Sequence, residues 1–156
     1  LGQMLPFLKA TNDLLLERGV ALPLPPMATD TPENRQEAGN EIQVQIYGEG
    51  KRGSYAAGPE ERRHLNRWVT KNCFGDYFAR DGLTYRERLM LNLCFIAAMG
   101  GCSGPLTNYA EANLRAQNDK VFLIDVLSQC LPYIGYPRVM EALAQVEAAA
   151  ARLSAE

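Results

Sequence analysis

Apolar residues recur at helical spacing along most of the chain, and no segment of useful length alternates apolar and polar residues with a period of two. A first helix is expected over about residues 6–18, with Gly19 as its C-cap. The following linker contains Pro23, Pro25 and Pro26, which disfavour both helix and central strand. The pattern therefore predicts an all-α protein.

The later helices are marked by prolines, capping residues and glycines. Thr84 and Glu87 form a Thr-x-x-Glu capping box, and Gly100-Gly101 ends the helix that it opens. Asn118 is expected to cap a later helix, and Pro132 to kink or end it. Helices are expected over about residues 31–47, from 59 onward, and over 84–99, 105–117, 119–134 and 137 to the C-terminal region, with a loop at 48–58.

Residues 89–99 form the most apolar stretch of the chain, and they are apolar on nearly every side of the expected helix. Such a helix is expected to be buried, either in the centre of a domain or between subunits. With the helix that follows Gly100-Gly101, it is expected to form a central helical hairpin over residues 83–117.

Size and charge exclude several classes of function. The chain has 156 residues, which suits one domain of about 100–200 residues. A net charge of −2 gives no electrostatic basis for binding nucleic acid. The apolar stretch at 89–99 contains Asn92 and is shorter than the ~20 residues that cross a bilayer, and no signal peptide is recognisable. We therefore expect a cytoplasmic protein that binds neither nucleic acid nor membrane.

The four cysteines indicate neither a disulfide framework nor a metal centre. Cys73, Cys94, Cys102 and Cys130 form no Cys-x-x-Cys pair, and His64 is the single histidine. Zinc sites usually combine four closely spaced ligands, so no metal is expected. Cys94 and Cys130 lie on apolar helices and are expected to pack there, whereas His64 is expected on a solvated face.

Several motifs in the second half of the chain occur in a recognisable order. Residues 73–83 read Cys-Phe-Gly-Asp-Tyr-Phe-Ala-Arg-Asp-Gly-Leu, and Arg88 lies on the next helix. Gly100-Gly101-Cys102 precedes Leu106, and residues 133–137 read Tyr-Ile-Gly-Tyr-Pro. Together these motifs, over about 70 residues, resemble the carboxymuconolactone decarboxylase superfamily.

The resemblance implies a helical domain of the alkylhydroperoxidase D-like fold, assembled into trimers or hexamers. It implies either decarboxylation of a γ-carboxymuconolactone in aromatic catabolism or thiol peroxidase chemistry, with no organic cofactor. Residues 31–156 would form this domain. Residues 1–30, a helix and a proline-rich linker, resemble the tail of a preceding repeat, so the chain resembles the C-terminal repeat of a two-repeat member.

The sequence departs from both branches of the family at residues that carry acid–base chemistry. The peroxidase branch has Cys-x-x-Cys-x-x-x-His, but here Pro105 and Tyr109 follow Cys102 at the second cysteine and histidine positions. Its upstream acid falls on Leu89 or Met90. The decarboxylase branch also has histidine where Tyr109 stands and glutamate where Leu89 stands, so a partner repeat would have to supply these groups.

Three residues are candidates for the chemistry. Cys102 precedes a helix, whose N-terminus favours a thiolate, and the alternative is a small residue packed at a helix junction. Tyr109 could donate a proton, or it could simply pack in the core. Arg88 could hold a carboxylate, or it could pair on the surface or cap the preceding helix.

Arg80, Cys73 and Tyr77 are the candidates for substrate binding, all from the first motif. The leading hypothesis is a carboxymuconolactone decarboxylase-like carboxy-lyase acting on a small anionic lactone or organic acid. An arginine would hold a carboxylate, and a tyrosine or water would protonate the carbanion left by carbon dioxide. The alternatives are a thiol-dependent antioxidant protein using Cys102, and a non-catalytic oligomeric module that binds a small molecule.

Overall fold

The computed structural model describes residue 2 and residues 4–155, and all the regular secondary structure in this range is helical, with no strand. The all-α prediction is confirmed. The longer elements are α1 (Met4–Glu17), α2 (Arg35–Tyr47), α3 (Arg63–Trp68), the π-helix η4 (Val69–Phe78), α4 (Tyr85–Met99), α5 (Ser103–Arg115), α6 (Lys120–Ile134) and α7 (Tyr136–Leu153). Short 3₁₀ turns occupy η1 (Glu49–Lys51), η2 (Ser54–Ala56) and η3 (Glu60–Arg62).

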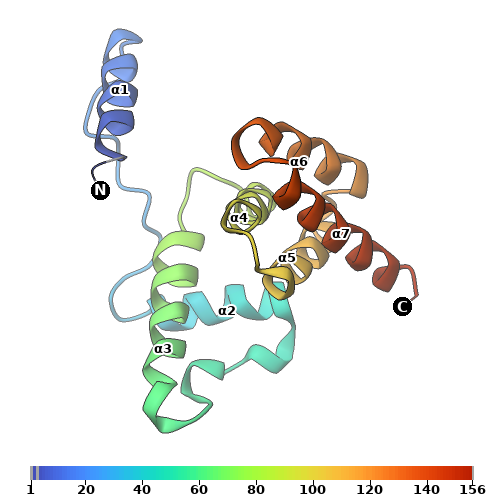
Figure 1. Cartoon of the computed structure of the whole chain (residues 1–156). Helices are drawn as coiled ribbons and strands as arrows, with labels where there is room; N and C mark the ends of the chain where they lie inside the picture. Colours follow the sequence, from blue (N-terminus) through green and yellow to red (C-terminus); the bar gives the residue numbers. More distant parts are fainter. Residues whose placement is uncertain (1, 3, 156) are drawn as a thin grey trace.

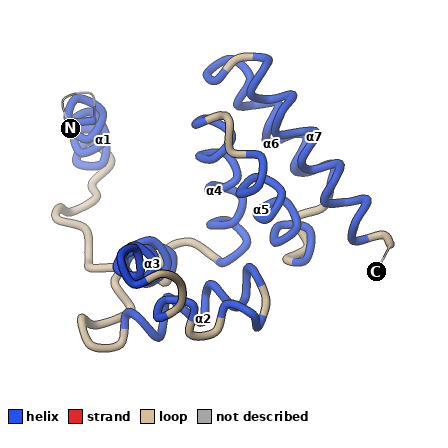
Figure 2. The backbone as a smooth tube through the Cα atoms, turned by 60° about the horizontal axis from the view of Figure 1, so that its bottom comes forward, coloured by secondary structure: helices blue, strands red, loops and turns tan. Residues whose placement is uncertain are grey.

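The helices after residue 35 pack in two groups that share a core (Figures 1 and 2). In the first group, α2 lies across η4, which continues α3. In the second group, α4 packs on α5 and α6, and α7 packs on α5 and α6. Helix α1 stands apart from both groups in both views. No helix among the described residues is long and apolar enough to cross a bilayer.

Helix α4 is central, but only one of its faces is buried. Leu89, Leu93 and Ala97, spaced by four residues, are at most 1% exposed and form part of the shared core. On the opposite face Phe95 and Met99 are 61% and 70% exposed. The expected burial in the domain centre therefore holds for the first face, and the second face has no cover within the described chain.

Helix α2 and the π-helix η4 cross at two glycines, Gly39 and Gly75. A Cβ atom on Gly39 would lie 2.0 Å from the carbonyl oxygen of Thr70, and one on Gly75 would lie 2.4 Å from that of Arg35. Both obstructing atoms belong to the backbone, so they cannot rotate away as a side chain can. The crossing therefore requires glycine at both positions.

The capping box that opens α4 is present as the sequence predicts. Glu87 N donates to Thr84 Oγ1 at 3.3 Å, and Thr84 N donates to Glu87 Oε2 at 2.7 Å. These bonds hold the pKa of Glu87 below its ordinary value of 4.5, with the backbone donor of Thr84 as the main cause. The box therefore fixes the start of the helix that lies between the core and the candidate site.

Thr84→Ala is expected to lower the free energy of unfolding by about 1 kcal/mol, because an N-cap acceptor is lost. Because the pKa of Glu87 is lower in the folded chain than in the unfolded chain, its carboxylate stabilises the fold at pH values above the unfolded pKa. This stabilisation is lost as the pH falls through the folded pKa. Alanine keeps the backbone donor and loses the bond from Thr84 Oγ1 to Glu87 Oε2 (2.8 Å), so the difference between Thr84→Ala and the parent should narrow slightly at acidic pH. Urea unfolding at neutral pH and near pH 3 measures the free energy of unfolding of both proteins. A Thr84→Ala protein as stable as the parent at neutral pH contradicts the role of Thr84 as a cap.

Two helix starts differ from the sequence prediction. Regular α2 begins at Arg35 rather than near residue 31, because Asn34 Oδ1 accepts from Thr31 N and the intervening residues form a turn. Asp119, not Asn118, caps α6, and its Oδ1 accepts from Phe122 N at 2.8 Å. Helix α6 ends at Ile134, as the sequence predicts, so Pro132 lies inside the helix and does not end it.

One apolar face of the third helix is exposed. Leu65, Trp68 and Val69 are 44–63% exposed, and the Trp68 ring lies edge-on to that of His64. The face that packs on α2 instead carries Thr70, Phe74, Gly75 and Phe78 from η4. The helix passes from α3 into the π-helix η4 at Val69, which changes the spacing of its buried positions.

Candidate functional site

A groove of about 390 Å³ lies between the C-terminal half of η4 and the outward face of α4. Most of its walls are apolar, and two guanidinium groups and one phenol supply polar chemistry. The groove is lined by Cys73, Tyr77, Phe78, Arg80, Leu83, Arg88, Leu91, Asn92 and Phe95.

The groove brings together four of the six site residues predicted from the sequence. Cys73, Tyr77 and Arg80 come from η4 and the turn after it, and Arg88 comes from the first turn of α4. Cys102 and Tyr109 are not among the lining residues. Residues expected to bind substrate therefore share a wall, whereas two of the three expected to carry the chemistry lie elsewhere.

Arg88 is held by the backbone at the end of η4. Its Nη1 donates to the carbonyl oxygen of Tyr77 at 3.1 Å, and its Nη2 donates to that of Asp81 at 2.9 Å and to that of Arg80. These bonds match the helix-capping alternative, because the last carbonyls of a helix lack donors of their own. They also fix the guanidinium at the groove wall.

Arg80 is the more available of the two cations. Its side chain is exposed, and no hydrogen bond or ion pair from its guanidinium to another described residue is found. Burial, followed by the nearby positive charge of Arg80, lowers the pKa of Arg88. An anion between these cations would relieve their repulsion, so the groove favours a negatively charged ligand.

Tyr109 lies inside the core rather than on the groove. Its side chain is 7% exposed, and its ring meets that of Tyr47 edge-on with centroids 6.2 Å apart. Burial raises the pKa of Tyr109, and a hydrogen bond donated to Tyr47 raises it further. A phenol held in this way packs and orders the core, and it has no direct path to a ligand in the groove.

Cys102 occupies the N-cap position of α5, as predicted, but its surroundings differ from those of the groove. The carboxylate of Glu141 from α7 accepts from Gly101 N at 3.2 Å and from Ser103 Oγ at 3.0 Å. The positive end of α5 is therefore already occupied by an anion of the chain itself. The side chain of Arg138 also lies beside Gly100.

No protein-family model matches the sequence, and a search of curated proteins finds no match. The resemblance to carboxymuconolactone decarboxylases thus stays a prediction, and the groove has to be interpreted from its own chemistry.

Several lining residues were missed at the sequence level. Leu91, Asn92 and Phe95 of α4 form one side of the groove, and Asn92 Nδ2 donates to the carbonyl oxygen of Arg88 at 2.8 Å. Asn92 could have been predicted as a lining residue, because it is the one polar residue in the apolar stretch 89–99. Leu91 and Phe95 carried none, since their sequence context does not separate them from core residues.

A second hollow, of about 450 Å³, lies where α2 meets α5, and Tyr47, Lys51 and Asn108 are among its lining residues. It contains none of the six predicted site residues. The Nζ atom of Lys51 lies 5.8 Å from the centroid of the Tyr47 ring. The hollow is therefore a surface feature with mixed polarity rather than a concentration of like charge.

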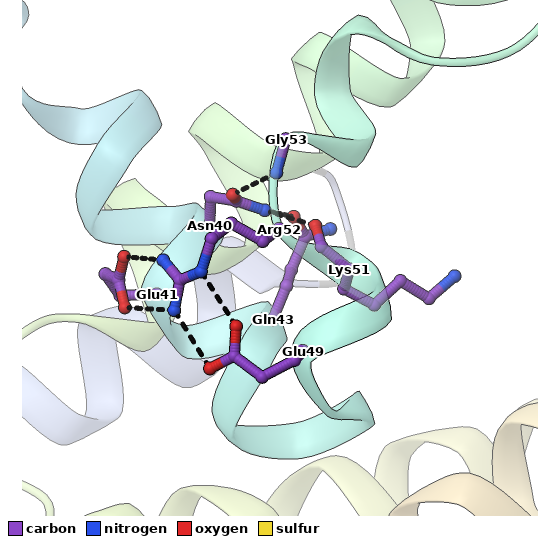
Figure 3. Close-up of polar contacts among 7 residues, drawn as sticks. All are labelled: Asn40, Glu41, Gln43, Glu49, Lys51, Arg52 and Gly53. Atoms are coloured by element: carbon purple, nitrogen blue, oxygen red, sulfur yellow. Dashed lines mark hydrogen bonds and ion pairs between the residues drawn. The ribbon is translucent and has the colours of Figure 1, made fainter.

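A polar cluster beside the second hollow orders the loop after α2 (Figure 3). Asn40, which is 5% exposed, donates from Nδ2 to the carbonyl oxygen of Lys51 at 2.8 Å and accepts on Oδ1 from Gly53 N at 2.8 Å. Arg52 bridges Glu41 and Glu49, with Nη1 2.5 Å from Glu41 Oε1. These bonds hold the loop after α2 against the helix.

The described residues contain no group of three or more His, Cys, Asp or Glu side chains arranged to hold a metal ion. Cys94 and Cys130 are half-buried neighbours on α4 and α6, and burial followed by the adjacent Cys130 raises the pKa of Cys94. Raised pKa values suit thiols that pack rather than react. This placement agrees with the packing role expected for both residues.

Proposed function

We propose that the chain is a carboxymuconolactone decarboxylase-like protein that binds a small organic anion in the groove between η4 and α4. The observation that supports this proposal is the pair Arg80 and Arg88 at one wall of an otherwise apolar groove of about 390 Å³. A lactone or cyclic acid presents a flat apolar body and a carboxylate, and these two parts match the two kinds of wall. The proposal includes an alkylhydroperoxidase D-like fold and a homo-oligomer.

The proposed reaction is decarboxylation of a lactone acid. Arg80 pairs with the substrate carboxylates, and the fixed charge of Arg88 adds positive potential beside it. The bond between carbon and the departing carboxylate breaks, its electron pair enters the conjugated lactone, and carbon dioxide leaves. The Tyr77 hydroxyl or a water then delivers a proton to carbon, and solvent reprotonates the phenolate. Tyr77 fits this role better than Tyr109, because it lines the groove and is 61% exposed.

A binding module without chemistry is the second candidate. Tyr109 stands where the resemblance calls for an acid–base histidine, and its hydroxyl donates a hydrogen bond to Tyr47 in the core, which raises the pKa of Tyr109 and keeps it protonated. The groove then retains cations and apolar walls that suffice for binding, but it lacks that histidine and the glutamate replaced by the fully buried Leu89.

Arg80→Gln is expected to lower kcat/KM for carbon dioxide release from γ-carboxymuconolactone about tenfold, because a charge-assisted hydrogen bond to a carboxylate is lost. Arg62→Gln is the matched control, since Arg62 is an exposed arginine that does not line the groove. Coupled detection of carbon dioxide measures the rate, and calorimetry with the same lactone measures binding. An Arg80→Gln protein as active as the parent contradicts the proposal. Binding that depends on Arg80 without carbon dioxide release selects the binding module.

A further inference from the structure

Helix α1 is amphipathic, yet no other part of the described chain covers its apolar side. None of its residues is buried, and it stands apart from the other helices in Figures 1 and 2. Its polar side carries Lys9, Asp13 and Glu17 at successive turns, with Lys9 Nζ 2.6 Å from Asp13 Oδ2. The large apolar side chains exposed by 46–76% are Met4, Leu5, Phe7, Leu8, Leu14 and Leu16.

A second unpartnered apolar face lies on α4. Leu91, Phe95 and Met99 follow one another at intervals of four residues, on the side away from the buried Leu89 and Leu93. Phe95 and Met99 are 61% and 70% exposed, and Leu91 lies partly within the groove. The stripe therefore continues from the groove to the C-terminal end of the helix.

The two helices are similar in length, and their exposed apolar faces together offer enough area for a stable interface. Helix α1 has 14 residues and α4 has 15, which correspond to about 21 and 22 Å. With six exposed apolar side chains at roughly 100 Å² each, one α1 offers on the order of 600 Å². Two such contacts, each covering an α4 face as well, reach the ~1,200–2,000 Å² that stable interfaces bury.

We propose that α1 of one copy of the chain packs along the outward face of α4, formed by Leu91, Phe95 and Met99, in a second copy. The exchange covers both unpartnered faces with surfaces that the same chain supplies. Pairing of α1 with α1 would leave the α4 face bare. Leu91 and Phe95 also line the groove, so the pairing shares a wall with the ligand site proposed above.

The placement of the linker favours a partner copy over the chain's own α4. Asp81 N donates to the carbonyl oxygen of Met27 at 2.9 Å, and Thr29 Oγ1 donates to that of Ala79, so the linker is anchored beside the groove. Beyond this anchor α1 points away from α4 (Figure 1). A membrane is a poorer partner, because Asp13 and Glu17 outnumber Lys9 on the polar side and anionic lipids favour basic faces.

The test uses full-length variants of each face. Sedimentation equilibrium of the parent should give a mass of at least twice 17.3 kDa, because α1 of each chain occupies the α4 face of another. Leu8→Asp in α1 and Phe95→Asp in α4 should each reduce the mass to one chain, because each places a charge in the contact. Ala10→Asp, on the polar side of α1, is the matched control and should keep the parent mass. Both altered residues are at least half exposed, and circular dichroism verifies that each variant remains folded.

Mixing separates the exchange from other assemblies. The Phe95→Asp chain retains an intact α1, and the Leu8→Asp chain retains an intact α4. An equimolar mixture at high concentration should therefore recover pairs of chains that neither variant forms alone. A monomeric parent overturns the proposal, and so does a Phe95→Asp protein that keeps the parent mass. Monomeric variants whose mixture recovers no pairs overturn it as well, as does loss of lipid-vesicle binding in Leu8→Asp with no change in mass.

Discussion

Gly39→Ala is expected to lower the free energy of unfolding by at least about 3 kcal/mol, a large share of the stability of a domain of this size. The added methyl group would lie 2.0 Å from the carbonyl oxygen of Thr70 and 2.7 Å from the amide nitrogen of Gly75. Relief requires α2 and η4 to separate, and this movement also opens contacts made by Phe74 and Phe78. The midpoint of thermal unfolding should fall by roughly 6–12 °C.

Gly104→Ala provides the control for that experiment. Gly104 lies in α5 with no atom within 4 Å of an added Cβ, and alanine favours helix over glycine. The variant should be as stable as the parent or slightly more so. Thermal unfolding of both variants, followed by circular dichroism, tests the crossing. A Gly39→Ala protein that melts within about 2 °C of the parent is incompatible with the close approach of α2 and η4.

Asn113→Asp is expected to destabilise the chain strongly at neutral pH. Asn113 is fully buried, and its Nδ2 donates to the carbonyl oxygen of Leu89 at 3.1 Å and to that of Tyr109 at 2.7 Å. Asn118 Nδ2 in turn donates to Asn113 Oδ1 at 2.8 Å and to the carbonyl oxygen of Arg86. The aspartate keeps the shape of the side chain but directs a carboxylate oxygen at two carbonyl oxygens.

The pH dependence identifies the cause of this loss. Burial should raise the folded pKa of the new carboxyl above its unfolded value of about 3.9. Because the folded pKa is raised, the variant keeps its stability at pH values below the unfolded pKa and loses it as the pH rises toward the folded pKa. Compared with the parent at each pH, Asn113→Asp should lose little at pH 4 and at least about 3 kcal/mol at pH 7.

Asn108→Asp is the matched control, because Asn108 lies on the same helix but is exposed. It should show no comparable change between the two pH values. Urea unfolding of the parent and both variants at pH 4 and pH 7 measures the free energy of unfolding that each variant loses at each pH. A cost for Asn113→Asp that is equal at both pH values contradicts a buried carboxylate and indicates lost packing instead.

The candidate site could be predicted in part because its residues are close in sequence. Cys73, Tyr77 and Arg80 lie within one helical segment and its turn, so a local motif places them near one another. Arg88 follows one helix later and was expected nearby. The second wall was not predictable, because Phe95 has the same apolar character as the buried Leu93 two residues earlier. Only the packing of α4 decides which of its sides faces the groove.

The role of a polar side chain was equally undetermined by the sequence. Asn118 was expected to cap α6, and Asp119 could do so as well, since both residue types are good caps. Asn118 is instead buried between Arg86 and Asn113, and this position leaves the cap to Asp119. Tyr109 likewise changed from a candidate proton donor to a buried partner of Tyr47. Distant partners decided both cases.

The sequence by itself determined the all-helical class, the capping box of Thr84 and Glu87, and the ends of α2 and α4 at Gly48 and Gly100. These features depend on interactions within a few residues, and composition and spacing encode such interactions directly. Tertiary structure alone decided that Gly39 must be a glycine, that one face of α4 stays open, and that Tyr109 is buried beside Tyr47. These features depend on contacts between segments far apart in the chain. The local sequence pattern does not show which distant segment a residue will contact.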